Sequence, residues 1–471
     1  MSDAKKEMNS IKKFFKLEEN GTTVKTELLA GLTTFFAMVY ILMVNADMFT
    51  ATGVSYGAIY IATAISAVVG TVLIGLLANL PLAQASGMGL NAFFVYTVCL
   101  GFGFTYANAL VLVLIDGLVF IALTLTGLRK KIFEAIPDAV RVAIPAGIGL
   151  FIAFLGLQNA KIVIPSTSTG VTLGSFNLLS QPWGNVMPML VTIAAFLAIA
   201  VMAKKNVKGA VLYGILGGAA LYYLLGLTVP DFYANLGITM SSPFDAFGEF
   251  FNESFAKVFT EGFDFSVYAS AHGTANLVLM ILTTALAFCM VDMFDTIGTL
   301  YGACSRGNML TEEGEVPNMD RAMLADAIAT TTGAICGTST VTTFVESSAG
   351  VAEGGRTGLS SMATAFLFFV AMFLSPIAQL IPSCATAAAL IYVGVLMMSC
   401  VTKIDWHAPE SAIPAFLTLA VMPFSYNISY GIAFGLISYV VIHAFIGKIR
   451  EIKVGTWVIT ALFLAMLFLT H

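Results

Sequence analysis

The chain has 471 residues, of which 58% are hydrophobic and only 10% are charged, with a net charge of −5. Soluble domains carry about 25% charged residues, so this chain lacks the charged surface that a soluble enzyme or a nucleic-acid-binding protein needs. We therefore expect an all-α, polytopic membrane protein embedded in a lipid bilayer.

The N-terminal segment, residues 1–27, is polar and contains lysines but no apolar stretch before Leu28, so we expect no cleaved signal peptide. Apolar segments near the roughly 20 residues needed to cross a bilayer then follow one another. Seven precede a long polar stretch at 228–270 and seven follow it: 28–50, 56–79, 82–101, 105–127, 139–157, 186–203 and 207–227, then 272–301, 321–336, 338–352, 358–380, 384–402, 409–424 and 428–447. The last run, 457–470, is short, and spanning the bilayer, lying in the interface and packing beside the bundle stay open for it.

Two of these fourteen segments, 82–101 and 338–352, are apolar at one end and rich in Gly, Ser or Thr at the other. We expect each to be a discontinuous span that contains a short strand. Irregular backbone at membrane depth must be surrounded by protein or water rather than by lipid. Broken helices of this kind typically form the binding site of a transporter.

The distribution of positive charge tests this count, because Lys and Arg are enriched in cytoplasmic loops. With the N-terminus in the cytoplasm, only Lys161 and Lys257 fall on the outer side, and the acidic stretch 228–270 is extracellular. The residues that fall on the cytoplasmic side are Lys5, Lys6, Lys12, Lys13, Lys16, Lys25, Arg129, Lys130, Lys131, Arg141, Lys204, Lys205, Lys208, Arg306, Arg321, Arg356, Lys403, Lys448, Arg450 and Lys453. We therefore predict fourteen spans with both ends inside.

An odd number of spans in each half requires a seven-plus-seven inverted repeat. Two faint internal echoes agree with it. The first aligns GLTTFFAMVYILMVNADMF at 31–49 with ILTTALAFCMVDMFDTIGT at 281–299. The second aligns QASGMGLNAFF at 84–94 with TSTVTTFVESS at 338–348. The second echo aligns Asn91 with Glu346.

Acidic side chains inside the predicted spans are candidate functional groups, since a carboxylate at that depth needs a cavity or a partner. Glu346 follows an extended Thr-Thr-Phe stretch and opens a half-helix, where it either binds a ligand or caps the helix. Asp292 and Asp295, three residues apart, share one helix face and would repel if both were ionised, so at least one is expected to bind a proton or a neighbour. Asn91 either contacts the ligand or satisfies the backbone.

The remaining intramembrane polar residues have structural roles as their default. We expect hydrogen bonds between helices for Asp47 and Asp116, a cap or brace for Asp326, and a local ion pair or brace for Glu353 and Arg356. No Walker A motif, HExxH motif or metal-like Cys/His spacing occurs in the sequence. We therefore expect no enzyme, no metal and no other cofactor.

Four stretches then carry a resemblance to a known family: GLTTFFAMVYILMVNADMF, PLAQASGMGLNAFF, VDMFDTIGTLYG and GTSTVTTFVESSAGVAEGGRTGLSS. With them, residues 20–450 resemble the nucleobase–cation symporter-2 family, in its AzgA-like hypoxanthine/adenine/guanine permease branch. The resemblance implies a UraA-like fold, with a core domain (28–137 and 271–380) that carries substrate past a gate domain (138–227 and 381–447). A C-terminal segment, 448–471, follows, and a homodimer formed through the gate domain is possible.

The resemblance also implies the activity, which is secondary active uptake of guanine, hypoxanthine or adenine across the cytoplasmic membrane. Proton symport by an elevator-like alternating-access motion is expected, with sodium coupling left open. Asp295, in an acid–x–x–Gly pattern, and Glu346 would bind the base, and together with Asp292 they would couple it to protons. The other expected substrate contacts are Asn91, Phe93, Phe344, Thr343 and Met88. The alternative is an anion transporter or channel of the same inverted-repeat architecture.

Overall fold

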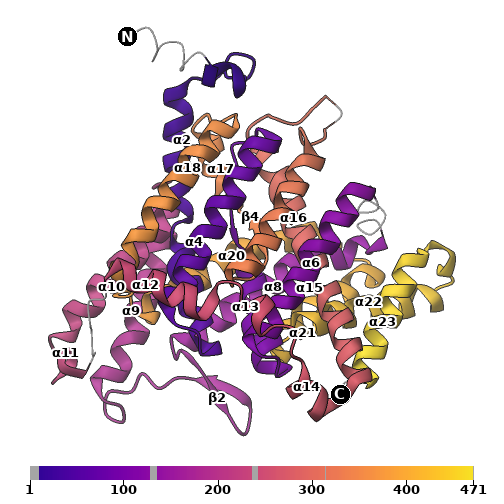
Figure 1. The fold of residues 1–471 in the computed structure, drawn as a ribbon. Helices are drawn as coiled ribbons and strands as arrows, with labels where there is room; N and C mark the ends of the chain where they lie inside the picture. The colour runs from indigo at the N-terminus through magenta and orange to yellow at the C-terminus, as the bar shows by residue number, and fades with distance from the viewer. Residues whose placement is uncertain (1–9, 128–134, 236–241, 313, 470–471) are drawn as a thin grey trace.

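The computed structural model describes residues 10–127, 135–235, 242–312 and 314–469, which are mostly helical. Among the positive charges used above to orient the chain, Lys5, Lys6, Arg129, Lys130 and Lys131 lie outside these ranges. Figure 1 shows the N-terminal segment at one end of the molecule and the C-terminal end of the last helix toward the opposite end.

The first half of the chain contains seven of the predicted segments, and each coincides with a helix or a strand–helix unit. Its α-helices are α2 (Val24–Met38), α3 (Tyr40–Phe49), α4 (Tyr56–Leu73), α5 (Met88–Ala92), α6 (Tyr106–Thr126), α8 (Asp138–Asn159), α9 (Trp183–Lys204) and α10 (Ala210–Gly226). Its 3-10 or π turns and strands are η1 (Thr50–Thr52), η2 (Ile74–Ala78), η3 (Phe93–Gly101), β1 (Gln84–Ser86), β2 (Val163–Ser166) and β3 (Gly170–Leu173).

The second half begins after a set of short helices and again follows the predicted segments. The short helices are α11 (Phe232–Asn235), α12 (Pro243–Glu249), η4 (Phe250–Ser254), α13 (Lys257–Thr260) and α14 (Ser266–His272). The elements that follow are α15 (Thr274–Arg306), α16 (Met319–Cys336), β4 (Val341–Thr343), α17 (Ser347–Ala352), α18 (Gly358–Ala371), η5 (Met372–Leu374), α19 (Ser375–Ala378), α20 (Ser383–Met397), η6 (Met398–Lys403), α21 (Pro409–Ser425), α22 (Ile428–Phe445), η7 (Ile449–Glu451) and α23 (Val454–Leu469).

In the described ranges, nine helices are long and apolar enough to cross a bilayer. Local sequence explains where several of them begin. Ser55 accepts a hydrogen bond from the backbone N–H of Ala58 at the start of α4, and Thr105 does the same for Asn108 at the start of α6. Such hydroxyl caps satisfy N–H groups that have no partner within the helix.

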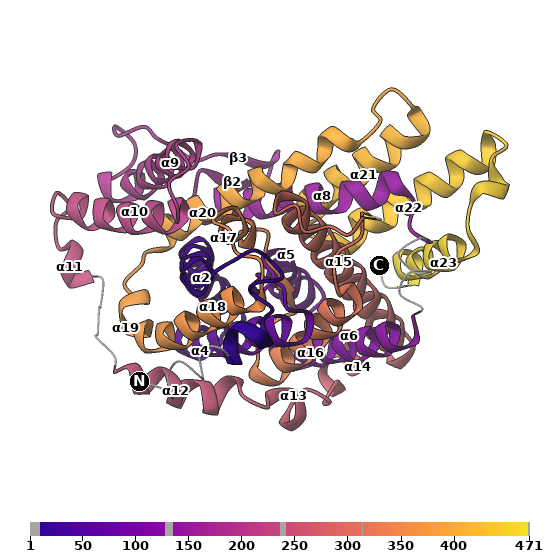
Figure 2. The same cartoon turned by 90° about the horizontal axis from the view of Figure 1, so that it is seen from above.

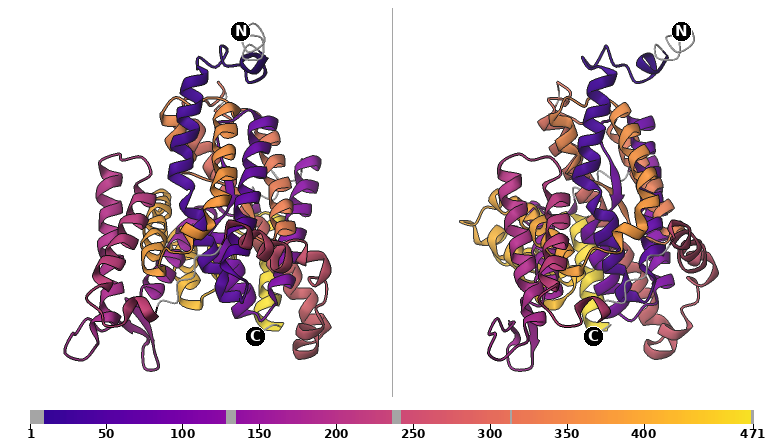
Figure 3. Two further views of the ribbon diagram at one scale, coloured as in Figure 1. Left: turned by 60° about the vertical axis from the view of Figure 1, so that its left-hand side comes forward. Right: turned by 90° about the vertical axis from the view of Figure 1, so that its left-hand side faces the viewer.

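The helices fall into two sets that lie side by side. Figure 2 shows α8, α9, α10, α20, α21 and α22 in a row along one side of the molecule. Within this set α20 packs against α8, α9 and α10, and α21 packs against α8 and α22. In the other set α2 packs against α17 and α18, α4 against α16 and α18, and α6 against α15 and α16. Figure 3 shows that α2 and α18 reach further toward the N-terminal end than α9 and α10.

The two discontinuous segments meet in an antiparallel strand pair at the centre of the second set. Gln84 of β1 lies opposite Thr343 of β4, and Ser86 lies opposite Val341. Each strand is followed by a short helix, α5 after β1 and α17 after β4. All residues of both strands are buried, and their pairing satisfies backbone groups that lipid could not.

Two features were left open or missed by the sequence. The hairpin of β2 and β3, between α8 and α9, was not predicted. The last helix, α23, packs against α15 and α22 and buries Phe463 and Met466. Of the placements left open for this run, the structure therefore supports packing on the bundle.

Candidate binding site

Two predicted acids, Asp295 of α15 and Glu346 at the start of α17, line one small cavity of about 60 Å³. The cavity lies where the β1–α5 and β4–α17 units meet α15 and α20. Its lining residues are Tyr40, Gly87, Met88, Gly89, Asp295, Thr299, Thr343, Phe344, Val345, Glu346, Val393 and Met397. The predicted residues Met88, Thr343 and Phe344 are therefore brought together with the two acids.

Glu346 is held by a residue that the sequence did not single out. Its Oε1 atom accepts a hydrogen bond from the hydroxyl of Tyr40 at 2.6 Å. Although Glu346 occupies the N-cap position of α17, its side chain makes no capping hydrogen bond. Of the two roles left open for this carboxylate, helix capping is therefore not observed, and ligand binding stays a prediction.

Asp295 lies across the cavity on the long helix α15. Its Oδ2 atom accepts a hydrogen bond from Thr342 of β4 at 3.3 Å. Thr299, one helical turn further along, lines the same cavity. A ligand between these groups would meet two carboxylates and hydroxyl groups on its edges, with Met88, Phe344, Val393 and Met397 as apolar cover.

Three predicted site residues do not line the cavity. Asn91 is 0% exposed, and its Oδ1 accepts hydrogen bonds from Ser86, at 2.7 Å, and from Ser339. Phe93 is buried against Phe288, with ring centroids 4.7 Å apart. The Nδ2 atom of Asn91 also donates to the backbone carbonyl of Ser86 at 3.3 Å, which fits the second of its two open roles, satisfying the backbone.

Asp292, the third of these residues, belongs to a buried group behind the cavity. Asp292, Asp116 of α6 and Asp326 of α16 are each 0% exposed. Asp326 accepts hydrogen bonds from Gln84 and Thr296, both at 2.9 Å, so it braces β1 as expected.

The default roles of the other acids are confirmed in part. Asp47 accepts hydrogen bonds from Ser383 and Thr386 of α20, at 3.0 and 2.9 Å, as expected for a contact between helices. An ion pair between Glu353 and Arg356 does not form. Glu353 instead pairs with Lys208 at 2.6 Å, and the Arg356 guanidinium donates to the carbonyl groups of Val351 and Gly355.

A wider vestibule of about 350 Å³ shares Glu346 with the small cavity. The loop that joins α9 to α10 lines it on one side and α17 on the other, and Arg306 and Tyr392 contribute to its wall. The Lys208–Glu353 pair bridges these two sides. The vestibule therefore connects Glu346 with the end of the molecule that carries the lysines and arginines of the predicted cytoplasmic loops.

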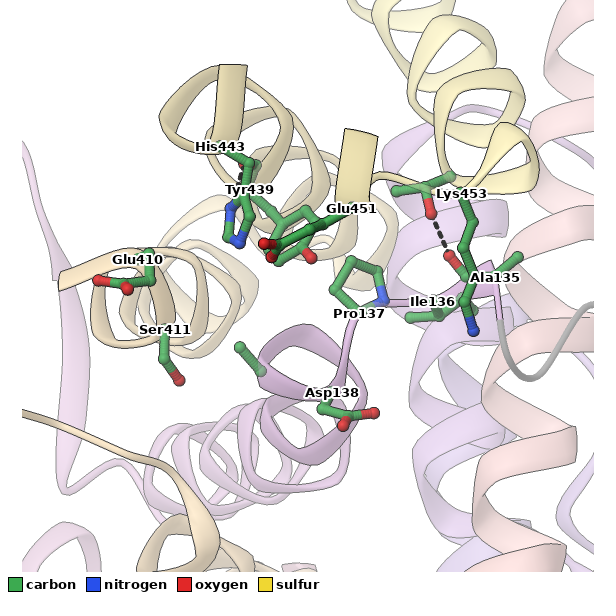
Figure 4. Close-up of a pocket in the computed structure, with 12 residues that line it drawn as sticks. Ala135, Ile136, Pro137, Asp138, Glu410, Ser411, Tyr439, His443, Glu451 and Lys453 are labelled. Carbon is green, nitrogen blue, oxygen red and sulfur yellow. Dashed lines mark hydrogen bonds between the residues drawn. The ribbon is translucent and has the colours of Figure 1, made fainter. Parts of the chain in front are cut away.

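A separate pocket of about 310 Å³ contains none of the predicted site residues. Figure 4 shows it between the start of α8, α21, α22 and the segment that leads into α23, with the Ala135 carbonyl bonded to Thr456. His443 stacks on Tyr439 there, with ring centroids 3.9 Å apart. Because neither Asp295 nor Glu346 reaches this pocket, it is not the candidate site.

Comparison with known families places these features in context. The sequence profile of the permease family matches residues 25–450. A putative permease of Methanocaldococcus jannaschii is 41% identical over 457 residues, covering 97% of this chain and 98% of the relative. The guanine/hypoxanthine permease PbuO of Bacillus subtilis is 40% identical (97% and 100% covered), and the adenine permease AdeP of Escherichia coli is 37% identical (96% and 95% covered).

Two solved structures share the fold at low sequence identity. The transmembrane domain of the cyanobacterial bicarbonate transporter BicA aligns with a TM-score of 0.59 and 18% identity, covering 88% of this chain and 97% of BicA. The anion transporter SLC26A9 aligns with a TM-score of 0.61 and 12% identity, covering 90% and 65%. At such identities the likeness concerns the fold alone.

Proposed function

Since the chain belongs to the nucleobase–cation symporter-2 permease family, we propose that it imports purine nucleobases across the cytoplasmic membrane. Its relatives include guanine/hypoxanthine and adenine permeases, which are transporters rather than enzymes. The observation that carries the proposal is that Asp295 and Glu346 line one small cavity.

The chemistry of the bases suits this pair of acids. Guanine, hypoxanthine and adenine present N–H donors along their edges, and carboxylates accept such bonds strongly. Thr342 and Tyr40 each donate to one oxygen of a carboxylate, which leaves the other oxygen of each acid for the base. A site built in this way rejects ligands without donors, because its own polar groups would stay unpaired.

The size of the cavity supports an alternating-access motion. Its volume, about 60 Å³, is much smaller than the 350 Å³ of the vestibule, so we expect it to widen when a purine enters. Val393 and Met397 of α20 close the cavity from the row of predicted gate helices. An elevator-like shift of the core helices past α20 would open it.

We extend the proposal to the finer architecture. The fourteen segments form fourteen spans in a seven-plus-seven inverted repeat, with core and gate domains as predicted above. The N-terminal segment and the link 446–453 lie in the cytoplasm, and α23 then leads the chain away from that side, which departs from the prediction that both ends lie inside. Proton symport and a homodimer through the gate domain complete the proposal.

An anion carrier, the alternative considered above, has less support. The residues that line the cavity include two acids and no Lys, Arg or His. An anion would be repelled by these carboxylates, whereas a neutral base with N–H donors would be held.

The test is uptake of radiolabelled guanine, hypoxanthine and adenine into proteoliposomes that contain the purified protein, with and without a protonophore. We expect saturable uptake of at least one purine, and loss of that uptake in Asp295→Ala and Glu346→Ala at equal protein content. Glu312→Gln, at an exposed site, is the control. Normal transport by either alanine variant would remove that residue from the site.

A further inference from the structure

Behind the proposed purine pocket lies a group of three aspartates on which no positive charge acts from the part of the chain that the structure describes. Asp116, Asp292 and Asp326 come from three different helices, and none of them is exposed. The three residues lie near one another because α6 packs against both α15 and α16. Asp292 is close enough to Asp326, Asp116 and Asp295 to interact electrostatically with each of them. We call Asp116, Asp292 and Asp326 the rear acid cluster.

The cluster has more hydrogen-bond acceptors than donors. In the described part of the chain, both oxygens of Asp292 lack a hydrogen-bond partner, as do Asp116 Oδ1 and Asp326 Oδ2. Gln84, whose amide nitrogen donates to Asp326, has an unpartnered amide oxygen of its own. The neighbouring hydroxyl of Thr330 does not fill the gap, since it donates to the Val341 carbonyl at 3.0 Å.

All five unpartnered atoms are hydrogen-bond acceptors, so the cluster is short of hydrogen-bond donors. A buried polar atom without a partner is destabilising, and several such atoms in one place indicate that something is bound there in the working protein. Protons on the carboxylates would turn acceptors into donors and would remove buried charge at the same time.

Other charged groups around the cluster do not neutralise it. Among the described residues, the charged groups that interact electrostatically with the cluster are its own carboxylates and Asp295. Asp295 in turn interacts with Glu346. Among the described residues, a further titratable neighbour is Cys289, which lies one turn before Asp292 on α15 and interacts electrostatically with both Asp116 and Asp292. Among the described residues, no group of three or more His, Cys, Asp or Glu is arranged to hold a metal ion, which favours protons over a metal cation.

We propose that the rear acid cluster is a proton-binding site, distinct from the purine pocket, and that it holds the coupling ion while the base crosses. This proposal rests on the proposed function. Asp295 and Glu346 then recognise the base, and Asp116, Asp292 and Asp326 bind protons that the base never touches.

The contacts between the purine pocket and the rear acid cluster indicate that base binding and proton binding favour each other. Asp326 accepts hydrogen bonds from Thr296, which is adjacent to Asp295, and from Thr343, which lines the purine cavity. The N–H donors of a base stabilise the ionised forms of Asp295 and Glu346, and negative charge there raises the proton affinity of the cluster beside it. By reciprocity, a loaded cluster favours base binding. Base and proton thus bind together, as symport requires.

The experiment compares Asp116→Asn, Asp292→Asn and Asp326→Asn with wild type and with Asp405→Asn, an exposed control. Asparagine mimics a permanently protonated aspartate. We expect each cluster variant to bind base within about threefold of wild type and to exchange internal for external base. Proton-driven accumulation, followed with labelled base and a pH-sensitive dye inside the vesicles, should fall at least tenfold, and base affinity should lose its pH dependence.

Three results would overturn the proposal: full proton-driven accumulation by Asp292→Asn and Asp326→Asn, loss of base binding by well-folded cluster variants, or accumulation driven by sodium. If a variant does not fold, infrared spectra of the wild-type protein decide, because a loaded cluster shows protonated carboxyl bands that shift when base binds. An unchanged spectrum on base binding contradicts the proposal. Absence of any purine binding by the wild type would instead refute the proposed function.

Discussion

The β1–α5 and β4–α17 units occupy matching places in the fold and use their polar residues in opposite ways. In the first unit Asn91 is fully buried, and its Oδ1 atom accepts hydrogen bonds from Ser86 and Ser339. In the second unit Glu346 points into the cavity and is bonded to Tyr40. One unit therefore anchors the strand pair, and under the proposed function the other presents its charged group to the ligand.

Residues at equivalent positions in the two units therefore have different roles. The sequence echo aligns Asn91 with Glu346, and the paired strands bring the two units together at one place. Yet a fully buried amide whose oxygen accepts two internal hydrogen bonds does not line the cavity, whereas a half-buried carboxylate with one protein donor keeps acceptor capacity for a substrate. The predictions that follow test this division of roles.

The largest effect is expected for the charge at Glu346. Glu346→Gln keeps the size of the side chain but replaces one acceptor oxygen with a donor amide, which would face the N–H groups of the base. Losing charged hydrogen bonds worth about 1.5–3 kcal/mol each should lower uptake about a hundredfold. Initial rates of purine uptake, normalised to protein in the vesicles, measure it; rates within threefold of wild type would contradict the assigned role.

In the other unit, Asn91→Ala should act on stability instead of affinity. The change leaves the hydroxyls of Ser86 and Ser339 without their shared acceptor in a fully buried place, which costs about 1–3 kcal/mol. We expect a lower thermal unfolding midpoint in detergent and a KM within twofold of wild type. A raised KM at an unchanged midpoint would return Asn91 to the binding site.

The fold was largely predictable because its strongest signals are local. Runs of apolar residues located every segment, and the Gly, Ser and Thr residues around Glu346 marked one of the two broken ones. The site was predictable in part. Which acid faces the cavity depends on helix rotation, so sequence alone could not separate Asp295 from Asp292.

The residues that were missed depend on contacts between distant segments. Ser339, which saturates Asn91, is 248 residues away from it in the chain. Tyr40 lies 306 residues from Glu346 and stands in an apolar stretch, where a tyrosine looks like any other aromatic residue of a membrane helix. Its one sequence signal is a hydroxyl in the middle of a predicted span, which requires a partner.

Tyr40→Phe should have an intermediate effect, because it removes the one hydroxyl seen to hold Glu346 in place. We expect KM to rise about tenfold, as for the loss of a hydrogen bond to a charged group, while maximal uptake changes little. Tyr60→Phe is the matched control, since its hydroxyl donates at 2.9 Å to the Ala371 carbonyl, away from the cavity. Equal KM values for the two variants would show that Tyr40 does not position Glu346.

The smallest effect is expected for the Lys208–Glu353 pair, which joins the end of the β4–α17 unit to the α9–α10 loop. Its side chains are 54% and 33% exposed, and such pairs contribute about 0.2–1 kcal/mol. If the core moves past the gate, this contact must break in each cycle. Lys208→Ala should therefore raise the uptake rate, by less than about fivefold. The double variant Lys208→Glu/Glu353→Lys should restore the wild-type rate, and high salt should reduce the difference between single variant and wild type. A single variant that behaves like wild type even at low salt would mean that the pair does not resist the motion, and the division of roles between the two units would then rest on Asn91 and Glu346 alone.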